Sequence, residues 1–541
     1  MSSHSRFIRG AAILAVAGIG VRFIGAAMKI LLVGIIGDEG IGLYQMSYPI
    51  YSTLLAISTA GIPVAVSKLV AENVTASDYR GAMRVFRIAL MILTLTGLVI
   101  ALFLFFSAGS IVRVLDSDPR ATLAIMAIAP AIFFVTMMSA LRGFFQGQQY
   151  MFPTAASQVV EQVGRLVVSL ALAVLLLPRG LEYAAAGAAF GTAAGGALGL
   201  LLLLPLYYLR RPDFMRKIRA QRKGAPQAAG RIIRHIFALA IPITFGSLIM
   251  PLLSLIDLAI VPGRLSAIGF TKQQATALFG QLTGLAGSVV YFPNVVTLAL
   301  SMSLVPAISE ALVLRDRALI RNRASISIKL TALFSIPAAI GLYLLAEPVI
   351  VVLFGPENAG AGYALAYMSW SVIPLGFYVA TTGILQGLGR TVTPVVNMAL
   401  GGAVKSVLAW FLTASVLHVG GAALATVFGT AVAALLNLYA VARHTGWRFR
   451  AGELLLLPGF CVALMGLAVR VGYRFLFPLF EPVLSTRMAC SAALFLVIAL
   501  GAAVYGLALL LSGALTREEL ELIPRVGPQL TSLAERWRLL R

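Results

Sequence analysis

The chain has 541 residues, of which 60% are hydrophobic and 11% are charged, and its formal net charge is +22. This composition excludes a soluble globular protein, because a soluble chain of this length carries far more charge. A basic balance would suggest nucleic acid in a soluble protein, but in a membrane protein Lys and Arg gather in cytoplasmic loops. We therefore predict an all-α polytopic membrane protein without a nucleic-acid partner.

Apolar runs recur along the whole chain, and each is long enough to cross a hydrocarbon layer about 30 Å thick. We predict about fourteen transmembrane helices, numbered here as spans. The N-terminus begins like a signal peptide, but its apolar stretch is longer and has no clear cleavage site, so we interpret it as span one. The approximate span cores are 11–36, 43–68, 86–108, 121–142, 154–177, 184–208, 236–261, 277–306, 327–346, 361–386, 393–416, 420–441, 453–475 and 488–512.

The positive charges predict the orientation of these spans. With the N-terminus in the cytoplasm, the inner loops and tails carry 30 of the 42 Lys and Arg residues, and the outer loops carry 8. Both termini are therefore expected in the cytoplasm. The basic inner segment 210–235 is either a topology anchor or a contact for anionic lipids, and the anchor is favoured. The tail, 513–541, is interpreted as a short surface helix.

Span one carries Arg22 and Lys29, which lie seven residues apart and therefore share one helix face. Two cations on one face of a membrane helix require anions, supplied either by a substrate or by Asp257 of span seven. Span two contains Tyr44, Gln45 and Tyr48, which would be costly against lipid but tolerable beside water or substrate.

Several prolines and one glycine interrupt spans two and eight. Such residues bend or loosen helices, which suits elements that move between two states. A competing interpretation is close helix packing through small residues. The predicted hinge positions are Pro49, Gly61, Pro63, Pro293 and Pro306, and Asn294 of span eight is a predicted cavity residue.

Charged residues also occur inside later spans. Glu161 and Arg165 are four residues apart in span five, in the favourable order for an ion pair, and mutual neutralisation is the slightly favoured interpretation. Lys405 lies at the corresponding depth of span eleven, without a Glu four residues before it. One cation near the centre of each half would suit a diphosphate or another anionic head group.

A repeat with a spacing near 240 residues divides the chain. "RGFFQGQQYMFP" from Arg142 corresponds to "TGILQGLGRTVTP" from Thr382, and "FGT" recurs at 190–192 and 428–430. Six spans separate the copies, so we predict two parallel six-helix repeats, which in transporters form lobes around a substrate site. The predicted organisation is an N-lobe (1–209), a basic linker (210–235), a C-lobe (236–442), spans 13 and 14 (443–512) and a cytoplasmic tail (513–541).

The segments "GDEGIGLYQMSYPIY", "GIPVAVSKLVAE", "FPTAASQVVEQVGR" and "SLVPAISEA" resemble the stage V sporulation protein B group of polysaccharide biosynthesis proteins. This group belongs to the multidrug/oligosaccharidyl-lipid/polysaccharide exporter superfamily, together with the lipid II flippases. The resemblance covers nearly the whole chain and implies two six-helix lobes around a central cavity, plus two further helices. It also implies that Arg22, in "VRFIGAAMK", corresponds to a cavity arginine of lipid II flippases. The arginines that those flippases bring from spans two and eight have no counterpart here.

The expected function is therefore the flipping of an undecaprenyl-diphosphate-linked sugar, such as lipid II, by a multi-pass protein of the bacterial cytoplasmic membrane. It would serve peptidoglycan or spore-cortex synthesis, as a monomer, in contact with membrane lipids and in some cases with the wall-synthesis machinery. No cofactor is expected; Na⁺ or H⁺ coupling through Asp257 or Glu161, or the membrane potential, would drive transport. The alternatives are an organic-cation exporter of the same fold and a non-transporting scaffold. A glycan polymerase is disfavoured, because Asp38 and Glu39 are too isolated to form a catalytic pair.

Overall fold

The computed structural model describes residues 3–59, 61–221, 227–449, 452–482 and 484–512, so the predicted surface helix in the tail lies outside the described residues. The described residues form helices and their connections, and no strand occurs among them. Within these ranges, twelve helices are long and apolar enough to cross a membrane, or thirteen if one bent pair is a single span. The predicted class, an all-α polytopic membrane protein, is confirmed.

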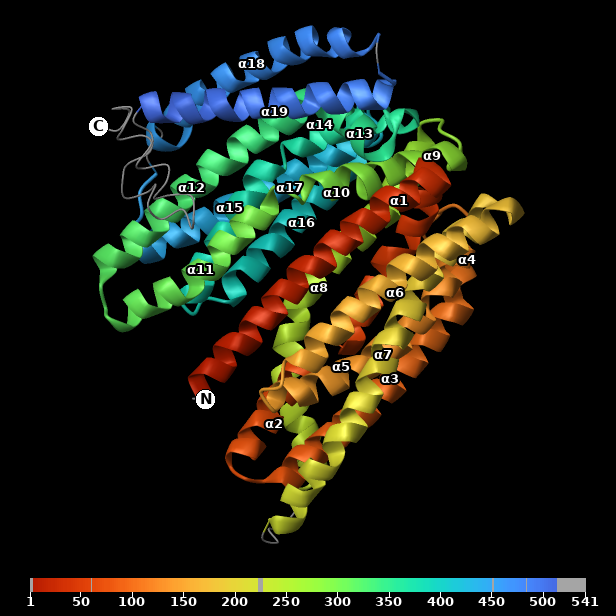
Figure 1. Cartoon of the computed structure of the whole chain (residues 1–541), viewed down its shortest axis with the longest axis vertical. Coiled ribbons are helices and arrows are strands. Elements are labelled where there is room, and N and C mark those ends of the chain that lie inside the picture. Colours follow the sequence, from red (N-terminus) through yellow and green to blue (C-terminus); the bar gives the residue numbers. More distant parts are fainter. Residues whose placement is uncertain (1–2, 60, 222–226, 450–451, 483, 513–541) are drawn as a thin grey trace. The chain divides into compact units, whose positions relative to one another are not determined.

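The chain divides into two compact units, residues 1–280 and 281–541, and each is described by itself. Figure 1 shows the first unit in red to yellow-green. Its elements are α1 (Ser3–Thr59), α2 (Ile62–Thr75), α3 (Tyr79–Val114), α4 (Ala121–Ile128), α5 (Pro130–Gly147), α6 (Phe152–Leu176), η1 (Leu177–Arg179), α7 (Leu181–Ala220), α8 (Ala229–Ala267) and α9 (Lys272–Phe279).

Predicted spans one and two both begin in α1, which is kinked at Gly37. The backbone there has φ 65° and ψ −173°, a conformation that glycine adopts without the penalty a side chain would bring. Span two contains Pro49 and is then broken between the end of α1 and the start of α2. Gly61 precedes α2 and Pro63 lies in its first turn. Gly61 and Pro63 therefore lie where α2 begins, whereas Pro49 lies inside α1; their role as hinges stays a prediction.

Aromatic side chains hold α3, α5 and α7 together at one end of the first unit. Phe86 stacks on Phe144 with ring centroids 4.4 Å apart, and Tyr207 lies 5.4 Å from Phe86. Phe214, near the end of α7, packs edge-on against Phe144 and Tyr79, at 5.4 and 5.6 Å. The part of α7 that extends into the basic segment is thus anchored to the core of the unit.

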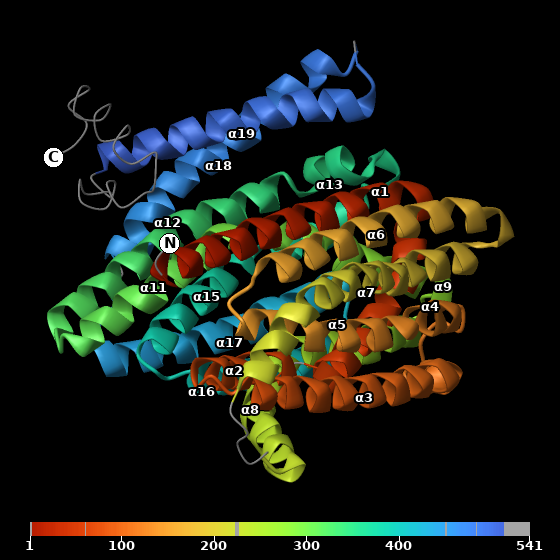
Figure 2. The ribbon, with the colours of Figure 1, turned by 60° about the horizontal axis from the view of Figure 1, so that its bottom comes forward.

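The second unit contains the remaining described helices. They are η2 (Gly280–Ala286, a π-helix that begins at the last residue of the first unit), α10 (Gly287–Val290), α11 (Asn294–Val313), α12 (Arg317–Leu344), α13 (Ala346–Phe354), η3 (Pro356–Asn358), α14 (Ala361–Ser369), α15 (Val372–Gly387), α16 (Val392–Leu412), α17 (Val419–Thr445), η4 (Gly452–Leu456), α18 (Leu457–Phe480) and α19 (Thr486–Leu511). Predicted spans 13 and 14 are α18 and α19, which lie side by side in Figures 1 and 2.

Span eight is divided into α9, η2, α10 and α11. The predicted hinge Pro293 lies in the turn between α10 and α11, and Pro306 lies within α11. In the first unit, α8 and α9 pack against α1, so the compact units do not divide where the repeat does. The lobe boundaries drawn from the repeat remain a prediction.

The two halves of the sequence repeat show the same local packing. Gly143 and Gly147 of α5 face the backbone of α2, where an added Cβ would lie 2.7 Å from the carbonyl oxygens of Pro63 and Ser67. Gly383 and Gly387 of α15 face α11 in the same way, with Ser301 and Val305 as their neighbours. The glycines of the "QG" motif are therefore needed for close contact between helices in each unit.

Candidate functional site

A buried arginine in the first unit is surrounded by tyrosines of span two. The Arg165 Nη2 group on α6 donates a hydrogen bond to the Tyr44 hydroxyl on α1, at 2.5 Å. Its guanidinium carbon lies 5.4 Å from the centre of the Tyr48 ring, a cation–π distance, and Tyr48 is 5.9 Å from the Tyr51 ring. These four residues are referred to below as the Arg165 cluster.

One polar atom of the Arg165 cluster has no partner within the described part of the chain. The Arg165 Nε atom is buried and has no hydrogen-bond partner among the described residues. Lys29 of α1 lies within electrostatic range of Arg165, and both side chains are half-buried. Burying two like charges together is costly unless an anion accompanies them. The geometry therefore suits a bound anion.

Glu161 is not the ion-pair partner that the sequence favoured for Arg165. Its Oε2 accepts from Arg142 Nη2 at 2.9 Å, and Arg142 Nε also donates to the Ser157 hydroxyl at 2.9 Å. The i, i+4 spacing predicts partners within one helix only. It therefore did not identify Arg142, which contacts Glu161 from near the end of α5. The only sequence signal for this partner was that Arg142 opens the "RGFFQG" motif. Because Glu161 forms its ion pair with Arg142, it is not the partner of Arg165. The positive charge of Arg165 is then open to interaction with another anion.

The structure brings Lys29, Tyr44, Tyr48 and Arg165 together, and Glu161 lies within electrostatic range of Tyr51. Arg22 is exposed on α1. Gln45 and Asp257 are half-buried, on α1 and α8. The alternative in which Asp257 neutralises a cation of span one stays a prediction.

In the second unit, Lys405 on α16 is only 8% exposed. It packs against Gly429 of α17, where an added Cβ would lie 2.5 Å from the Lys405 Cβ. Asn294 is also buried: its amide nitrogen donates to the Val290 carbonyl at 3.1 Å, and its Oδ1 has no hydrogen-bond partner among the described residues. Both residues are thus polar groups held within the unit, as expected for cavity candidates.

An apolar groove of about 650 Å³ lies where α1 and α6 diverge. The helices meet further along, since a Cβ on Gly25 would lie 3.2 Å from the Gln162 amide nitrogen. The same two helices carry Arg22, Lys29 and Arg165 beyond the groove. Its lining residues are Ile13, Val16, Ala17, Phe152, Ala155, Ala156, Val159 and Val160.

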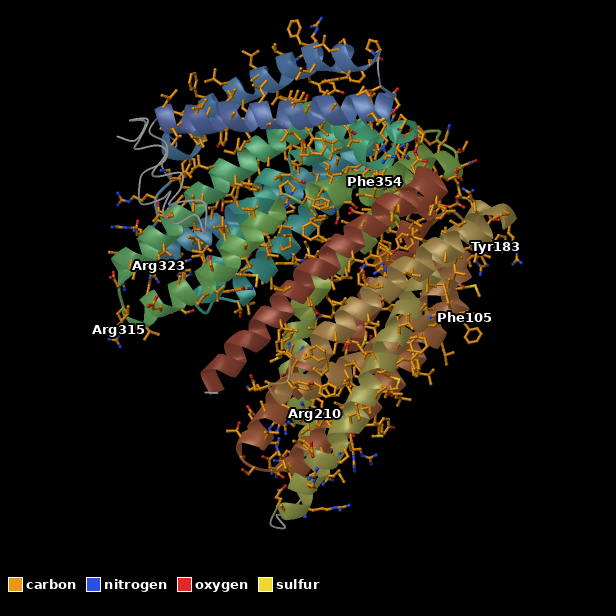
Figure 3. All side chains as sticks on the ribbon, viewed as in Figure 1. Phe105, Tyr183, Arg210, Arg315, Arg323 and Phe354 are labelled. Carbon is orange, nitrogen blue, oxygen red and sulfur yellow. The ribbon has the colours of Figure 1, made fainter. Side chains whose placement is uncertain are left out.

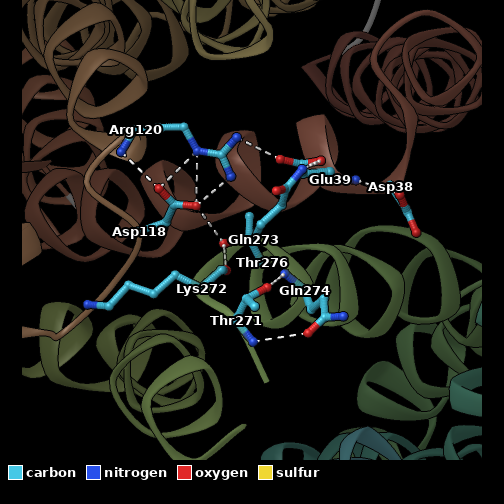
Figure 4. Close-up of polar contacts among 9 residues, drawn as sticks. All are labelled: Asp38, Glu39, Asp118, Arg120, Thr271, Lys272, Gln273, Gln274 and Thr276. Carbon is cyan, nitrogen blue, oxygen red and sulfur yellow. Dashed lines mark hydrogen bonds and ion pairs between the residues drawn. The ribbon is translucent and has the colours of Figure 1, made fainter. Parts of the chain in front are cut away.

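A second polar cluster joins three segments at the other end of the first unit (Figure 4). Arg120, in the connection between α3 and α4, forms ion pairs of 2.7 Å with Asp118 and with Glu39 on α1. Asp118 Oδ2 also accepts from the Thr276 hydroxyl of α9 at 3.1 Å, and Gln273 of α9 donates to Glu39 at 2.9 Å. We refer to these five residues as the outer clamp, because the charge distribution predicts this end to be extracellular.

The outer clamp shifts the ionisation of its own members. Burial opposes the charged form of Asp118, but hydrogen bonds from the Arg120 side chain and backbone, the Arg120 charge and the Thr276 hydroxyl together hold its pKa below the ordinary value. The hydrogen bond to Asp118 in turn raises the pKa of Arg120. Both Glu39 and Asp118 form ion pairs with Arg120 that join segments of the first unit. Within the described ranges, no group of three His, Cys, Asp or Glu side chains could hold a metal ion.

Long apolar helices, broken spans and buried cations are features of a membrane transporter, and the fold agrees. The structure of a protein titled "Lipid II flippase MurJ, inward closed conformation" superposes with a TM-score of 0.66 at 14% identity, over 92% of this chain and 98% of that one. The class is therefore a multi-pass membrane protein with a transporter fold.

The sequence identifies the family within this class. The model of the polysaccharide biosynthesis protein family matches residues 7–312, and that of the MatE family matches 242–411. Stage V sporulation protein B of Bacillus subtilis (strain 168) is 30% identical over 526 residues, covering 96% of this chain and 98% of that protein. The lipid II flippase MurJ of the same organism is 26% identical, with 93% and 94% coverage. The chain belongs to the polysaccharide biosynthesis protein family, as the sequence motifs predicted.

Proposed function

We propose that the chain flips an undecaprenyl-diphosphate-linked sugar, lipid II or a related precursor, across the bacterial cytoplasmic membrane. It would do so by alternating access, as a monomer, and would supply peptidoglycan or spore-cortex synthesis. The observation that carries this proposal is the Arg165 cluster with Lys29. Two half-buried cations, a guanidinium N–H that has no partner among the described residues, and tyrosine hydroxyls would together form a donor set for a diphosphate.

This arrangement would compensate for the absence of arginines from spans two and eight. Tyr44 and Tyr48 of span two position Arg165 of span five, so that a cation reaches the cluster from another helix. Arg22, which is exposed on α1, would act earlier along the path of the head group.

The apolar groove between α1 and α6 supports a lipid-linked substrate. The groove lies on the same two helices as Arg22, Lys29 and Arg165 but before the point where Gly25 meets Gln162, so an amphiphile would place its chain in the groove and its head group further along these helices. A water-soluble sugar or nucleotide would gain nothing from an apolar groove of this kind. We assign this apolar groove as the binding site for the first isoprene units of the carrier lipid.

The membrane potential would favour the outward direction. With the cell interior negative, each elementary charge that crosses 100 mV changes the free energy by about 2.3 kcal/mol, so an anionic diphosphate moves downhill as it leaves. If an ion resets the carrier, Asp257 and Glu161 are the candidate carboxylates, and Glu161 already pairs with Arg142. Transport that continues unchanged in Asp257→Asn would rule out that role.

Two alternatives remain. The MatE match over residues 242–411 favours an exporter of organic cations, but such a site should be acidic, whereas the cluster is cationic. A non-transporting scaffold would have no need to bury Lys29 and Arg165 together.

The test is flipping of fluorescent lipid II in proteoliposomes containing the wild-type chain, Arg22→Ala, Arg165→Ala or Arg165→Lys. We expect Arg22→Ala and Arg165→Ala to lose at least about tenfold in rate, the scale of one charge-assisted contact. Arg165→Lys should fall between, because it keeps the charge but loses the planar fork. Arg443→Ala, at the end of α17, is the control for loss of a cation.

Lipid II flipping at the wild-type rate in both alanine variants would contradict the assigned site. No flipping by folded wild type would exclude lipid II, and the same assay with other undecaprenyl-diphosphate sugars would then follow. Uptake of an organic cation without any lipid flipping would instead support the exporter.

A further inference from the structure

A second groove runs along the exposed side of α3, away from the Arg165 cluster. Its volume is about 390 Å³, and it is lined by Arg87, Leu90, Met91, Thr94, Leu95 and Leu98. These positions recur every three or four residues and thus form one stripe of the helix. Met91 and Leu95 are 65% and 62% exposed, which in a transmembrane helix means that they face hydrocarbon.

Cations lie at one end of this groove. Arg87 forms part of its wall, and the charges of Arg211 on α7 and of Arg87 both act on the hydroxyl of Tyr207. Both arginines are exposed, and neither forms an ion pair with another described residue. Arg210 follows the same helix end, where its guanidinium stacks over Tyr150 at 4.3 Å. Figure 3 shows Arg210 at this end, among many side-chain nitrogens.

Aromatic packing fixes the helix ends that carry Arg87 and Arg211. Phe86, next to Arg87, stacks on Phe144, and Tyr207 packs against both rings at 5.4 and 6.1 Å. Phe214 fixes α7 beyond Arg211, and it is buried. The helix ends that carry Arg87 and Arg211 are therefore held in place before any ligand arrives, which lowers the ordering cost of binding.

We propose that this groove is a binding site for an anionic phospholipid, separate from the substrate path. The phosphate group lies between Arg87 and Arg211, within reach of the Tyr207 hydroxyl, and one acyl chain follows Leu90, Leu95 and Leu98 across the membrane. Guanidinium groups match phosphate oxygens in geometry and charge, and the apolar groove excludes a water-soluble anion as the preferred occupant. The positive-inside distribution puts the site in the cytoplasmic leaflet.

The test is native mass spectrometry of the full-length protein in detergent, titrated with phosphatidylglycerol or phosphatidylcholine of identical acyl chains. We expect phosphatidylglycerol to bind at least about tenfold more tightly, because two cations act on its head group. Arg87→Gln/Arg211→Gln should abolish this preference. Arg231→Gln/Arg234→Gln, which removes two exposed cations of α8, is the matched control and should retain it.

A second pair of variants tests the groove itself. Leu95→Trp fills the groove and should weaken phosphatidylglycerol binding, whereas Val99→Trp, on the same helix but outside the lining, should not. Millimolar inorganic phosphate should fail to displace the lipid. Equal binding of the two lipids by wild type, or equal losses in the two double variants, would overturn the proposal. Displacement by inorganic phosphate alone would also overturn it, in favour of a simple anion site.

The wild-type protein gives an independent readout if a variant folds poorly. Phosphatidylglycerol should raise its thermal unfolding midpoint more than phosphatidylcholine does at equal concentration, because a ligand that binds only the folded state stabilises it. Identical shifts for the two lipids would contradict a site that recognises the head group.

Discussion

Arg142 and Glu161 form an ion pair between α5 and α6 in which both side chains are largely buried, with 14% and 27% exposure. Removing one partner of such a pair leaves the other charge without compensation. We expect Arg142→Ala to lower the free energy of unfolding by roughly 2 kcal/mol. Thermal unfolding in detergent measures this change.

A double-mutant cycle separates the pair from its surroundings. Arg142→Ala combined with Glu161→Gln should be less destabilised than the sum of the single variants, since no unpaired charge remains. The control pair is Arg216 and Asp213, which are 2.6 Å apart but mostly exposed, and their coupling should be near zero. Strict additivity at Arg142 and Glu161 would show that the ion pair does not stabilise the unit.

Tyr44 is 1% exposed, and its hydroxyl accepts the hydrogen bond from Arg165. Tyr44→Phe keeps the ring but leaves another guanidinium N–H unsatisfied. We expect a loss of about 1–3 kcal/mol in stability, together with slower lipid II flipping. Tyr183→Phe, at an exposed position in the first turn of α7, is the control. A wild-type flipping rate in Tyr44→Phe would show that the tyrosine does not position Arg165.

At the scale of elements, the break between α1 and α2 depends on a close helix contact. Gly61 donates its backbone N–H to the Thr244 hydroxyl of α8 at 3.2 Å. A Cβ at Gly61 would lie 2.0 Å from the Ala240 carbonyl oxygen, so any side chain must push α2 and α8 apart. The glycine that was predicted as a hinge is therefore a packing residue, and its role as a hinge stays a prediction.

Gly61→Ala should lower stability by about 1–3 kcal/mol, the usual cost of overpacking. Gly34→Ala, within α1, is the control: Gly34 is exposed, an added Cβ meets nothing within 4 Å, and stability should rise by about 0.5–1 kcal/mol. The thermal unfolding midpoints of the Gly61→Ala and Gly34→Ala variants, measured against wild type, give these changes. Equal effects would mean that the chain tolerates separation of α2 from α8.

At the scale of the whole molecule, the outer clamp joins α1, the α3–α4 connection and α9 through Asp118 and Arg120. The pKa of Asp118 lies below its ordinary value of 3.8, so its ionised form contributes stability that is fully present above about pH 4. That contribution is lost as the pH falls through the pKa of the folded state. The first unit should therefore become less stable in acid through this group.

Unfolding midpoints measured between pH 7 and pH 3 should fall steeply for the wild type. Asp118→Asn should be less stable at pH 7 but show a flatter profile, because the titrating carboxylate is absent. Asp213→Asn, which alters an exposed ion pair, should keep the wild-type profile. A wild-type pH profile in Asp118→Asn would show that the clamp does not contribute to acid sensitivity.

The helical fold was predictable because its signal is local. Each predicted span core lies largely in described helix, and the prolines at 63 and 293 mark a helix start and a turn, whereas Pro49 lies inside α1. The boundaries within span eight were not predictable, since a π-helix and a turn at 291–293 leave no distinct mark in hydropathy. The close helix contacts at Gly61 and Gly143 need the neighbouring backbone to be known.

The residues of the candidate site could be predicted from the sequence better than the contacts that they make. Buried charges are expensive in a membrane wherever they occur, so Lys29, Glu161, Arg165 and Lys405 could be singled out from sequence alone. Their partners depend on which helices meet. Arg142 reaches Glu161 from the neighbouring helix, and Tyr44 reaches Arg165 from 121 residues away.

The sequence by itself determined the membrane class, the helical architecture and the family, because hydropathy, charge bias and motifs are properties of contiguous residues. Tertiary structure alone decided which residues these charges meet. Electrostatic pairing depends on distances across helix interfaces, which spacing along one helix does not contain. Glu161 forms its ion pair with Arg142, and Arg165 donates to Tyr44 and lies near Tyr48 and Lys29.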